Sequence, residues 1–191
     1  MRLENNKPIL SYEEWDILIA TPFRYSMPVQ PEYMARFRPP YFRKNLLYCA
    51  EHKVTALYEY AYYLLKQRAH LPGIKQKTET RTIFSLYIDP KDIADLAKNG
   101  DAKIDDLTDR HNYSASHDFA KSHPNIKVLR YPSCRDPEKR FNYAVFEINS
   151  IHKEIGEEQV LSFSYYPQDY SILWIEPRLT ITATDVCCQL V

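Results

Sequence analysis

A chain of 191 residues with 25 basic and 25 acidic residues carries no net charge, which gives no indication of binding to nucleic acid or to an anionic membrane surface. Its 3 glycines form no GxxxxGK[ST] or GxGxxG phosphate loop, so an anion would have to bind to arginines, hydroxyls or helix N-termini. The cysteines show no CxxC spacing, and we expect neither a metal site nor a disulfide framework; they are Cys49, Cys134, Cys187 and Cys188.

The first half of the chain predicts two helices around a proline-rich stretch. A short helix is expected within residues 11–20, where Ser11 and Glu14 have the spacing of a capping box. Prolines then break the chain up to position 40, and four arginines lie among them: Arg24, Arg36, Arg38 and Arg43. Residues 45–50 predict a short buried strand, and a helix of about 54–69 follows and ends before Pro72.

The second half alternates apolar and polar segments. Strands are predicted at 81–88, 126–131 and 143–148, and two more within 159–184, around a turn at Pro167. A helix is predicted at 89–98, opened by Asp89-Pro90 and closed by Asn99-Gly100, and the polar segment 101–125 predicts one or two further helices. No linker divides the chain, so we expect a single α+β domain over residues 1–191.

The polar N-terminus, MRLENNKPIL, does not have the pattern of a signal peptide, and no apolar run is long enough to cross a membrane. We therefore expect a reduced, cytoplasmic protein.

One acid, Glu59, interrupts the apolar helix sequence TALYEYAYYLL. With 100° per residue, Leu57, Ala61 and Leu64 lie on one face, and Glu59 points away from it. Two interpretations remain open: a solvated carboxylate on a surface helix, or a functional acid between two buried faces. The aromatic residues on its own side favour burial, and a buried carboxylate needs partners.

Two other segments carry polar groups in restricted backbones. The arginines in TPFRYSMP and ARFRPPYFR lie among prolines and aromatics, and arginine forks suit a pyrophosphate. Ser133, in RYPSCRDP, is either a phosphate or ribose ligand or a turn residue. The histidines His111, His117 and His123 drift around a helix with a spacing of six and are expected at the surface.

In order and spacing, these segments resemble the RES domain family, most strongly over residues 20–148. The stretches that carry the resemblance are TPFRYSMP, ARFRPPYFRKNLLYCAEHKVTALYEYAYYLL and VLRYPSCRDPEKRFNYAVFEI. The resemblance implies an ADP-ribosyltransferase-like mixed β core with flanking helices, and catalytic residues Arg24, Glu59 and Ser133. It further implies substrate-binding roles for Arg36, Tyr48, Tyr25 and Arg135. Where the family often has Gly-Gly-Arg-Trp, this chain has Met34-Ala35-Arg36-Phe37, with Phe37 expected as an aromatic wall.

The resemblance also implies a function. RES proteins consume NAD, and many are toxins blocked by an Xre-type antitoxin protein. For this chain we expect NAD as a substrate, no other cofactor and no metal. We expect cleavage of the nicotinamide–ribose bond by hydrolysis or phosphorolysis. The alternatives are ADP-ribosylation of a protein target and an inert module that binds a nucleotide or a partner. A homo-oligomer is possible, and neither direct nucleic acid binding nor a membrane contact is expected.

Overall fold

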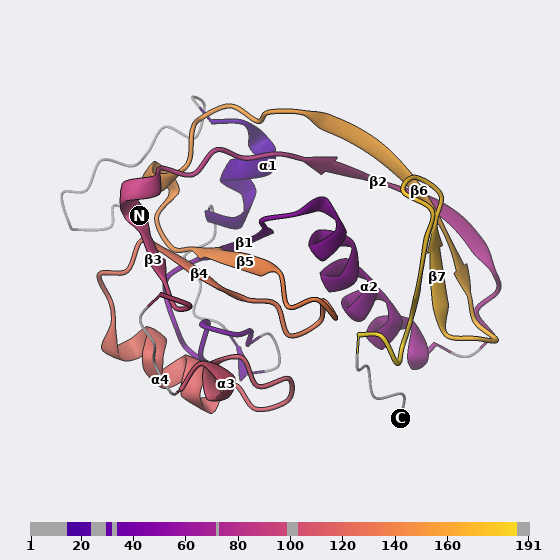
Figure 1. Ribbon diagram of the computed structural model, residues 1–191, viewed down its shortest axis with the longest axis horizontal. Coiled ribbons are helices and arrows are strands. Elements are labelled where there is room, and N and C mark those ends of the chain that lie inside the picture. The colour runs from indigo at the N-terminus through magenta and orange to yellow at the C-terminus, as the bar shows by residue number, and fades with distance from the viewer. Residues whose placement is uncertain (1–14, 24–29, 32–33, 72, 99–102, 187–191) are drawn as a thin grey trace, which may run out of the picture.

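The computed structural model describes residues 15–23, 30–31, 34–71, 73–98 and 103–186. Its helices and two four-stranded sheets confirm the α+β class (Figure 1). The helices are α1 (Ile17–Ala20), α2 (Lys53–Ala69), α3 (Ile104–Leu107) and α4 (Ser114–Ser122). The likeness to ADP-ribosyltransferases and the single domain stay predictions.

The first sheet has the order β1-β5-β4-β3, in which only β3 and β4 run parallel. Its strands are β1 (Leu47–Ala50), β3 (Ile93–Asp95), β4 (Val128–Pro132) and β5 (Phe141–Val145). Side chains alternate between its faces. Leu129 and Ala144 join the core beneath α3 and α4, while Val128 and Val145 pack with Ile19 of α1.

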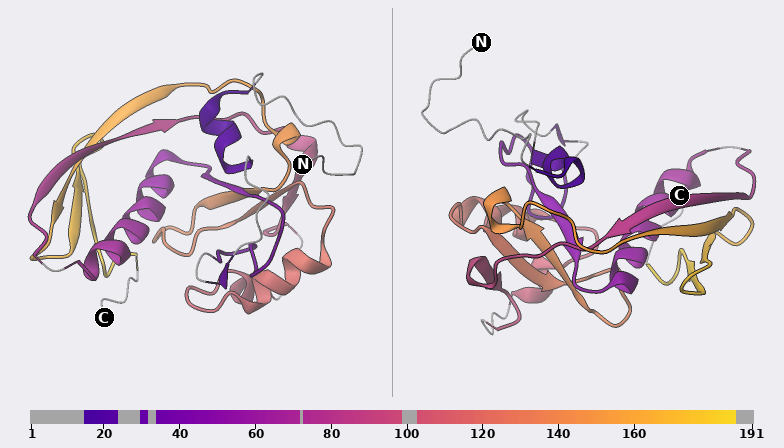
Figure 2. Two further views of the ribbon diagram at one scale, coloured as in Figure 1. Left: turned by 180° about the vertical axis from the view of Figure 1, so that it is seen from behind. Right: turned by 90° about the horizontal axis from the view of Figure 1, so that it is seen from above.

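The second sheet is antiparallel throughout, in the order β2-β6-β7-β8. Its strands are β2 (Lys77–Phe84), β6 (Glu158–Tyr166), β7 (Ser171–Trp174) and β8 (Leu179–Thr182). The long pair β2 and β6 arches over the molecule, and α2 lies below it, between the first sheet and β7 (Figures 1 and 2). Helix α2 therefore contacts both halves of the fold.

Several predicted elements are placed correctly. Helix α2 spans the predicted residues, the segment 101–125 forms the two helices α3 and α4, and β1, β4 and β5 lie within two residues of their expected starts. The strand predicted at 81–88 begins earlier, because the ladder with β6 starts at the pair Lys77 and Tyr165. The C-terminal segment holds three strands, β6, β7 and β8, so the prediction of two was wrong.

The helix predicted at 89–98 was also wrong. Asp89 does cap a short 3₁₀ turn at Pro90–Asp92, accepting a hydrogen bond from the Lys91 amide at 3.1 Å. The chain then enters β3, which pairs in parallel with β4. Local helix propensity is weak, and pairing with a buried strand overrides it here.

The first helix differs from its prediction as well. It begins at Ile17, and the Asp16 carboxylate caps it by accepting from the Leu18 amide at 2.8 Å. Ser11 and Glu14, the predicted capping box, lie outside the described residues. No helix in the described part of the chain is long and apolar enough to span a membrane.

Candidate functional site

Helix α2 is fixed by its apolar face. Leu57, Ala61 and Leu64 are buried in the core that includes the second sheet, as the sequence pattern predicts, and Leu65 is buried beside them. Glu59 does not belong to this core and is half-buried. The apolar residues thereby set the rotation of the helix, which turns Glu59 toward the first sheet.

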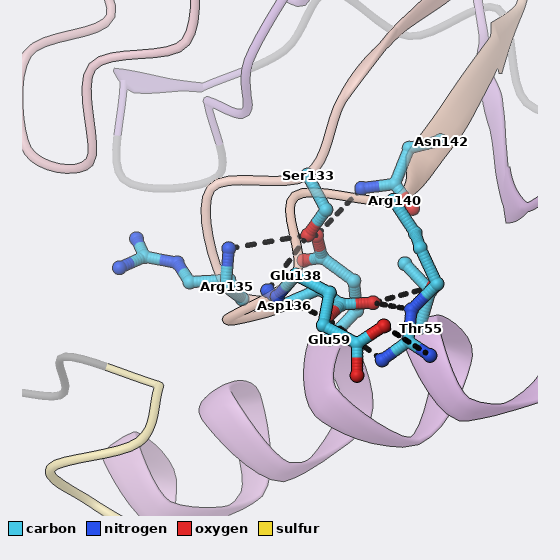
Figure 3. Close-up of polar contacts among 8 residues, drawn as sticks. All are labelled: Thr55, Glu59, Ser133, Arg135, Asp136, Glu138, Arg140 and Asn142. Carbon is cyan, nitrogen blue, oxygen red and sulfur yellow. Dashed lines mark hydrogen bonds and ion pairs between the residues drawn. The ribbon is translucent and has the colours of Figure 1, made fainter.

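The turn after β4 brings Ser133 to Glu59 (Figure 3). Ser133 is 2% exposed, and its hydroxyl donates to Glu59 Oε1 at 2.6 Å. The same hydroxyl accepts hydrogen bonds from the amides of Arg135 at 3.1 Å and Asp136 at 3.0 Å. Ser133 is thus a turn residue, as one interpretation of its sequence has it, and also a partner of the acid; its role as a phosphate or ribose ligand stays a prediction.

A second donor to Glu59 was missed by the sequence reasoning. Asn142 of β5 is 4% exposed, and its Nδ2 donates to the same Oε1 atom at 2.6 Å. The signal was present in the sequence: asparagine is depleted in strands, and this one interrupts the apolar segment FNYAV.

A buried polar clamp joins the N-terminal part of α2 to the same turn (Figure 3). The Thr55 hydroxyl donates to Asp136 Oδ2 at 2.7 Å, and Arg140 donates to both carboxylate oxygens, at 2.7 and 3.0 Å. Burial alone would raise the pKa of Asp136, but the hydrogen bonds from Arg140 and Thr55 outweigh it and lower the pKa below its ordinary 3.8. Asp136 is therefore ionised at neutral pH, which keeps the clamp closed.

Arg36 is held inside the protein. It is 7% exposed, and its guanidinium donates to the carbonyl oxygens of Leu107 at 2.8 Å and Asp109 at 2.6 Å and to the Cys134 sulfur at 3.1 Å. It also lies 4.9 Å from the ring centre of Tyr113. These hydrogen-bond partners include no carboxylate, so no described residue neutralises the positive charge of Arg36 through a direct ion pair.

Phe37 does not form the aromatic wall expected from its place beside Arg36. Ala35 and Arg38 exchange two backbone hydrogen bonds across a tight turn, in which Phe37 has a φ of 59°. Its ring is fully buried and packs edge-on against Phe119 and Tyr131. Burial of the ring offsets a backbone conformation that otherwise favours glycine.

His117 supports this turn from α4, and its predicted surface position was wrong. The residue is 8% exposed, and its Nε2 lies 3.0 Å from the Ala35 carbonyl oxygen. Burial lowers the pKa of His117 below its ordinary 6.5, so the ring is neutral at pH 7. The contact to a carbonyl oxygen then makes Nε2 the protonated nitrogen. His111 and His123 are exposed, as expected.

Tyrosines surround the acid. The hydroxyl of Tyr48 donates to the Arg36 carbonyl, and burial raises the pKa of this phenol. Burial also raises the pKa of Tyr131, with further contributions from the nearby Glu59 and Tyr48 and an opposing one from Arg36. Tyr48 is 38% and Tyr63 57% exposed, so both keep aromatic surface for a ligand. These interactions bring Glu59, Tyr48 and Arg36 into one neighbourhood.

Of the other predicted site residues, Arg135 lies in the turn beside Ser133, and two lie outside the described residues. Arg135 is 2% exposed, donates to the Arg110 carbonyl at 2.8 Å and stacks over the buried Tyr62 ring, 3.5 Å from its centre. It thereby braces the Ser133 turn against α2. Arg24 and Tyr25 lie outside the described residues.

Arg38 offers a cation near Tyr48. It contributes to the electrostatic field at the Tyr48 phenol, and one of its terminal nitrogens donates to Asn45 Oδ1 at 3.0 Å. Its Nε is buried and has no hydrogen-bond partner in the described part of the chain. A buried donor on a charged group that lacks an acceptor is energetically unfavourable.

A groove of about 580 Å³ opens between the two sheets. Leu47, Tyr48 and Cys49 of β1 line one side, and Thr82 and Ile83 of β2 line another. Glu59 and Ser133 are not among its lining residues. The volume falls in the range of ligand pockets, but of the predicted site residues that the structure describes, only Tyr48 lines the groove.

The described residues contain no group of three or more His, Cys, Asp or Glu placed to hold a metal ion. Cys49 and Cys134 are free thiols.

Comparison with known families gives one match: the RES domain family, over residues 9–165. This span includes Glu59, Ser133 and Asn142 and the whole first sheet. A search among curated proteins found no match.

Proposed function

The chain belongs to the RES domain family, a family of NAD-related domains associated with toxin–antitoxin systems, and from this premise we propose that it cleaves the nicotinamide–ribose bond of NAD. The acceptor under this proposal is water or phosphate, and the biological role is that of a toxin. The observation that carries the proposal is the Glu59 carboxylate, whose Oε1 receives hydrogen bonds from Ser133 and Asn142 at 2.6 Å each.

The chemistry needs a fixed negative charge. Cleavage of the nicotinamide–ribose bond builds positive charge on the ribose, as in glycoside cleavage. A carboxylate that is already oriented stabilises this charge without reorganising during the reaction. Glu59 takes that role, and Ser133 holds it in place rather than contacting the ribose directly, because its hydroxyl already makes three hydrogen bonds.

The leaving group needs no strong acid. Nicotinamide departs as a neutral molecule, so protonation by a histidine is not required. His117, the one buried histidine among the described residues, is neutral and in contact with the Ala35 carbonyl oxygen, which is compatible with a structural role.

The arginines supply the charge that attracts the pyrophosphate. Arg24 keeps its proposed role as a phosphate ligand through the family resemblance. Arg36 contributes its positive charge from a buried position, because its N–H groups donate to carbonyl oxygens of the protein. Arg38 contributes a further positive charge near Tyr48, and the exposed rings of Tyr48 and Tyr63 offer stacking surfaces for nicotinamide.

Glu59→Gln tests the proposal, because it keeps the size of the side chain and removes its charge. We expect the release of nicotinamide from NAD to fall by about 1,000-fold, the scale of a lost electrostatic group, while the melting temperature stays near that of the wild type. Glu138→Gln, on the exposed end of the Ser133 turn, is the matched control and should retain activity. Wild-type rates in Glu59→Gln would exclude the proposed mechanism.

The same assay separates the acceptors. Faster nicotinamide release with added phosphate indicates phosphorolysis, and an unchanged rate indicates hydrolysis. Label from NAD on a protein target would show ADP-ribosylation instead. Binding of NAD without any release would leave an inert module. The proposal also implies a cytoplasmic location and an Xre-type antitoxin partner, which co-purification with the product of a neighbouring gene would test.

A further inference from the structure

Asn142 lies near the start of β5, an inner strand of the first sheet. Its strand β5 is paired on both sides, and the residue is opposite Ala50 of β1 and Tyr131 of β4. Both flanking strands hold its backbone, so the side chain has a fixed starting point. At 4% exposure it is almost fully removed from solvent.

The two oxygens of Glu59 have different surroundings. Oε1 receives the hydroxyl of Ser133 and the amide of Asn142, both at 2.6 Å. Oε2 accepts no hydrogen bond from the described residues. A carboxylate with both donors on one oxygen is oriented by them and leaves the other oxygen for a further partner.

The Asn142 side-chain amide is oriented with its nitrogen toward Glu59, and this orientation leaves its own oxygen without a donor among the described residues. Its Oδ1 is buried and has no hydrogen-bond partner among the residues that the structure describes. Flipping the amide group would place its oxygen against the Glu59 carboxylate. The repulsion between these two acceptors would outweigh any hydrogen bond that the flipped amide gained. An apolar side chain would avoid the unpaired oxygen altogether, so stability alone does not account for asparagine at this position. Local rules of this kind are broken most often at functional sites.

From these contacts we propose that Asn142 is a positioning residue that, together with Ser133, holds Oε1 of Glu59 and presents Oε2 to the ribose of the substrate. The inference rests on the proposed function, since it assigns the substrate-facing atom of the same acid. A shift of the carboxylate by about 1 Å would be enough to lower the rate by about 100-fold.

Two variants of Asn142 separate positioning from simple support of the sheet. Asn142→Leu removes the donor and is expected to lower kcat for nicotinamide release by about 100-fold at every pH, with KM for NAD changed by less than about threefold. Asn142→Asp keeps the shape but places a second carboxylate against Glu59. Two carboxylates in one site share a proton, so a proton bound between them restores a donor to Oε1 at low pH.

The pH profile is therefore the decisive measurement. Between about pH 8 and pH 5, kcat of Asn142→Asp should rise relative to the wild type, whereas Asn142→Leu should show no such recovery. Asn149→Asp adds the same charge at an exposed position of the neighbouring turn and should follow the wild-type profile. Melting temperatures of all variants show which of them are folded under assay conditions.

The outcomes are distinct. If the wild type releases nicotinamide but Asn142→Leu keeps kcat within about twofold, the positioning role is wrong and the proposed function stands. The same holds if Asn142→Asp shows no acid recovery while folded. If neither the wild type nor Glu59→Gln releases nicotinamide from NAD, the proposed function fails, and the inference that rests on it fails too.

Discussion

The two sides of helix α2 are held by different kinds of contact. Toward the second sheet it packs Leu57, Leu64 and Leu65 against a core that includes Phe163 and Trp174. Toward the first sheet it presents Thr55 and Glu59, which bond to buried polar groups. Apolar packing is strong but tolerant of direction, whereas hydrogen bonds are individually weak and directional. The apolar side thus supplies stability, and the polar side determines where the acid points.

Leu65→Ala should have the largest effect on stability and breaks only the apolar side. Leu65 is fully buried, and its truncation leaves a cavity, so we expect the free energy of unfolding to fall by about 3 kcal/mol. Urea denaturation measures this change. Leu71 is 51% exposed, so the control Leu71→Ala should leave the free energy of unfolding nearly unchanged. Nicotinamide release per folded molecule should stay at the wild-type level. A large loss of kcat in folded Leu65→Ala would mean that the two sides do not act separately.

Asp136→Asn breaks the clamp on the polar side. At neutral pH the substitution weakens the charge-assisted bonds from Arg140, and we expect a loss of about 2 kcal/mol of stability. Because the pKa of folded Asp136 lies below 3.8, its contribution is complete above that value and disappears as the pH falls through the lowered pKa.

The difference in stability between Asp136→Asn and the wild type should therefore shrink as the pH falls below about 4. Denaturation at a series of pH values checks this, with Asp118→Asn as the exposed control. A difference that stays constant down to the acid limit would contradict the assigned ionisation of Asp136.

Thr55→Val removes one hydroxyl from the clamp and should have the smallest effect on stability of these three substitutions. Thr55 is fully buried, so valine keeps the shape but leaves Asp136 with one donor fewer, at a cost of about 1 kcal/mol. Thr55→Ser keeps the hydroxyl and is the matched control. Equal stability of the valine and serine variants would show that the hydroxyl contributes nothing. Because Thr55 lies one turn before Glu59, kcat should fall more in Thr55→Val than in Leu65→Ala.

The sequence was sufficient where a structural feature depends on neighbours in the chain. The spacing of Leu57, Ala61 and Leu64 predicted the buried face of α2, and Pro-Ser in RYPSCRDP predicted the turn at Ser133. The α+β class and the family followed from the order of such segments. Local pattern was misleading at 89–98, where Asp89-Pro90 indicated a helix and parallel pairing with β4 produced a strand.

The partners of Glu59 were decided by tertiary structure. Ser133 lies 74 residues away in sequence and Asn142 lies 83 away, and no local rule connects either of them to an acid on a helix. The resemblance implied that Arg36 binds the substrate, but not that the fold buries its side chain against the carbonyls of Leu107 and Asp109. Periodicity determines which face of an element is buried, because it depends on residues a few positions apart. Which polar groups meet there depends on how distant elements pack, and this the sequence alone did not determine.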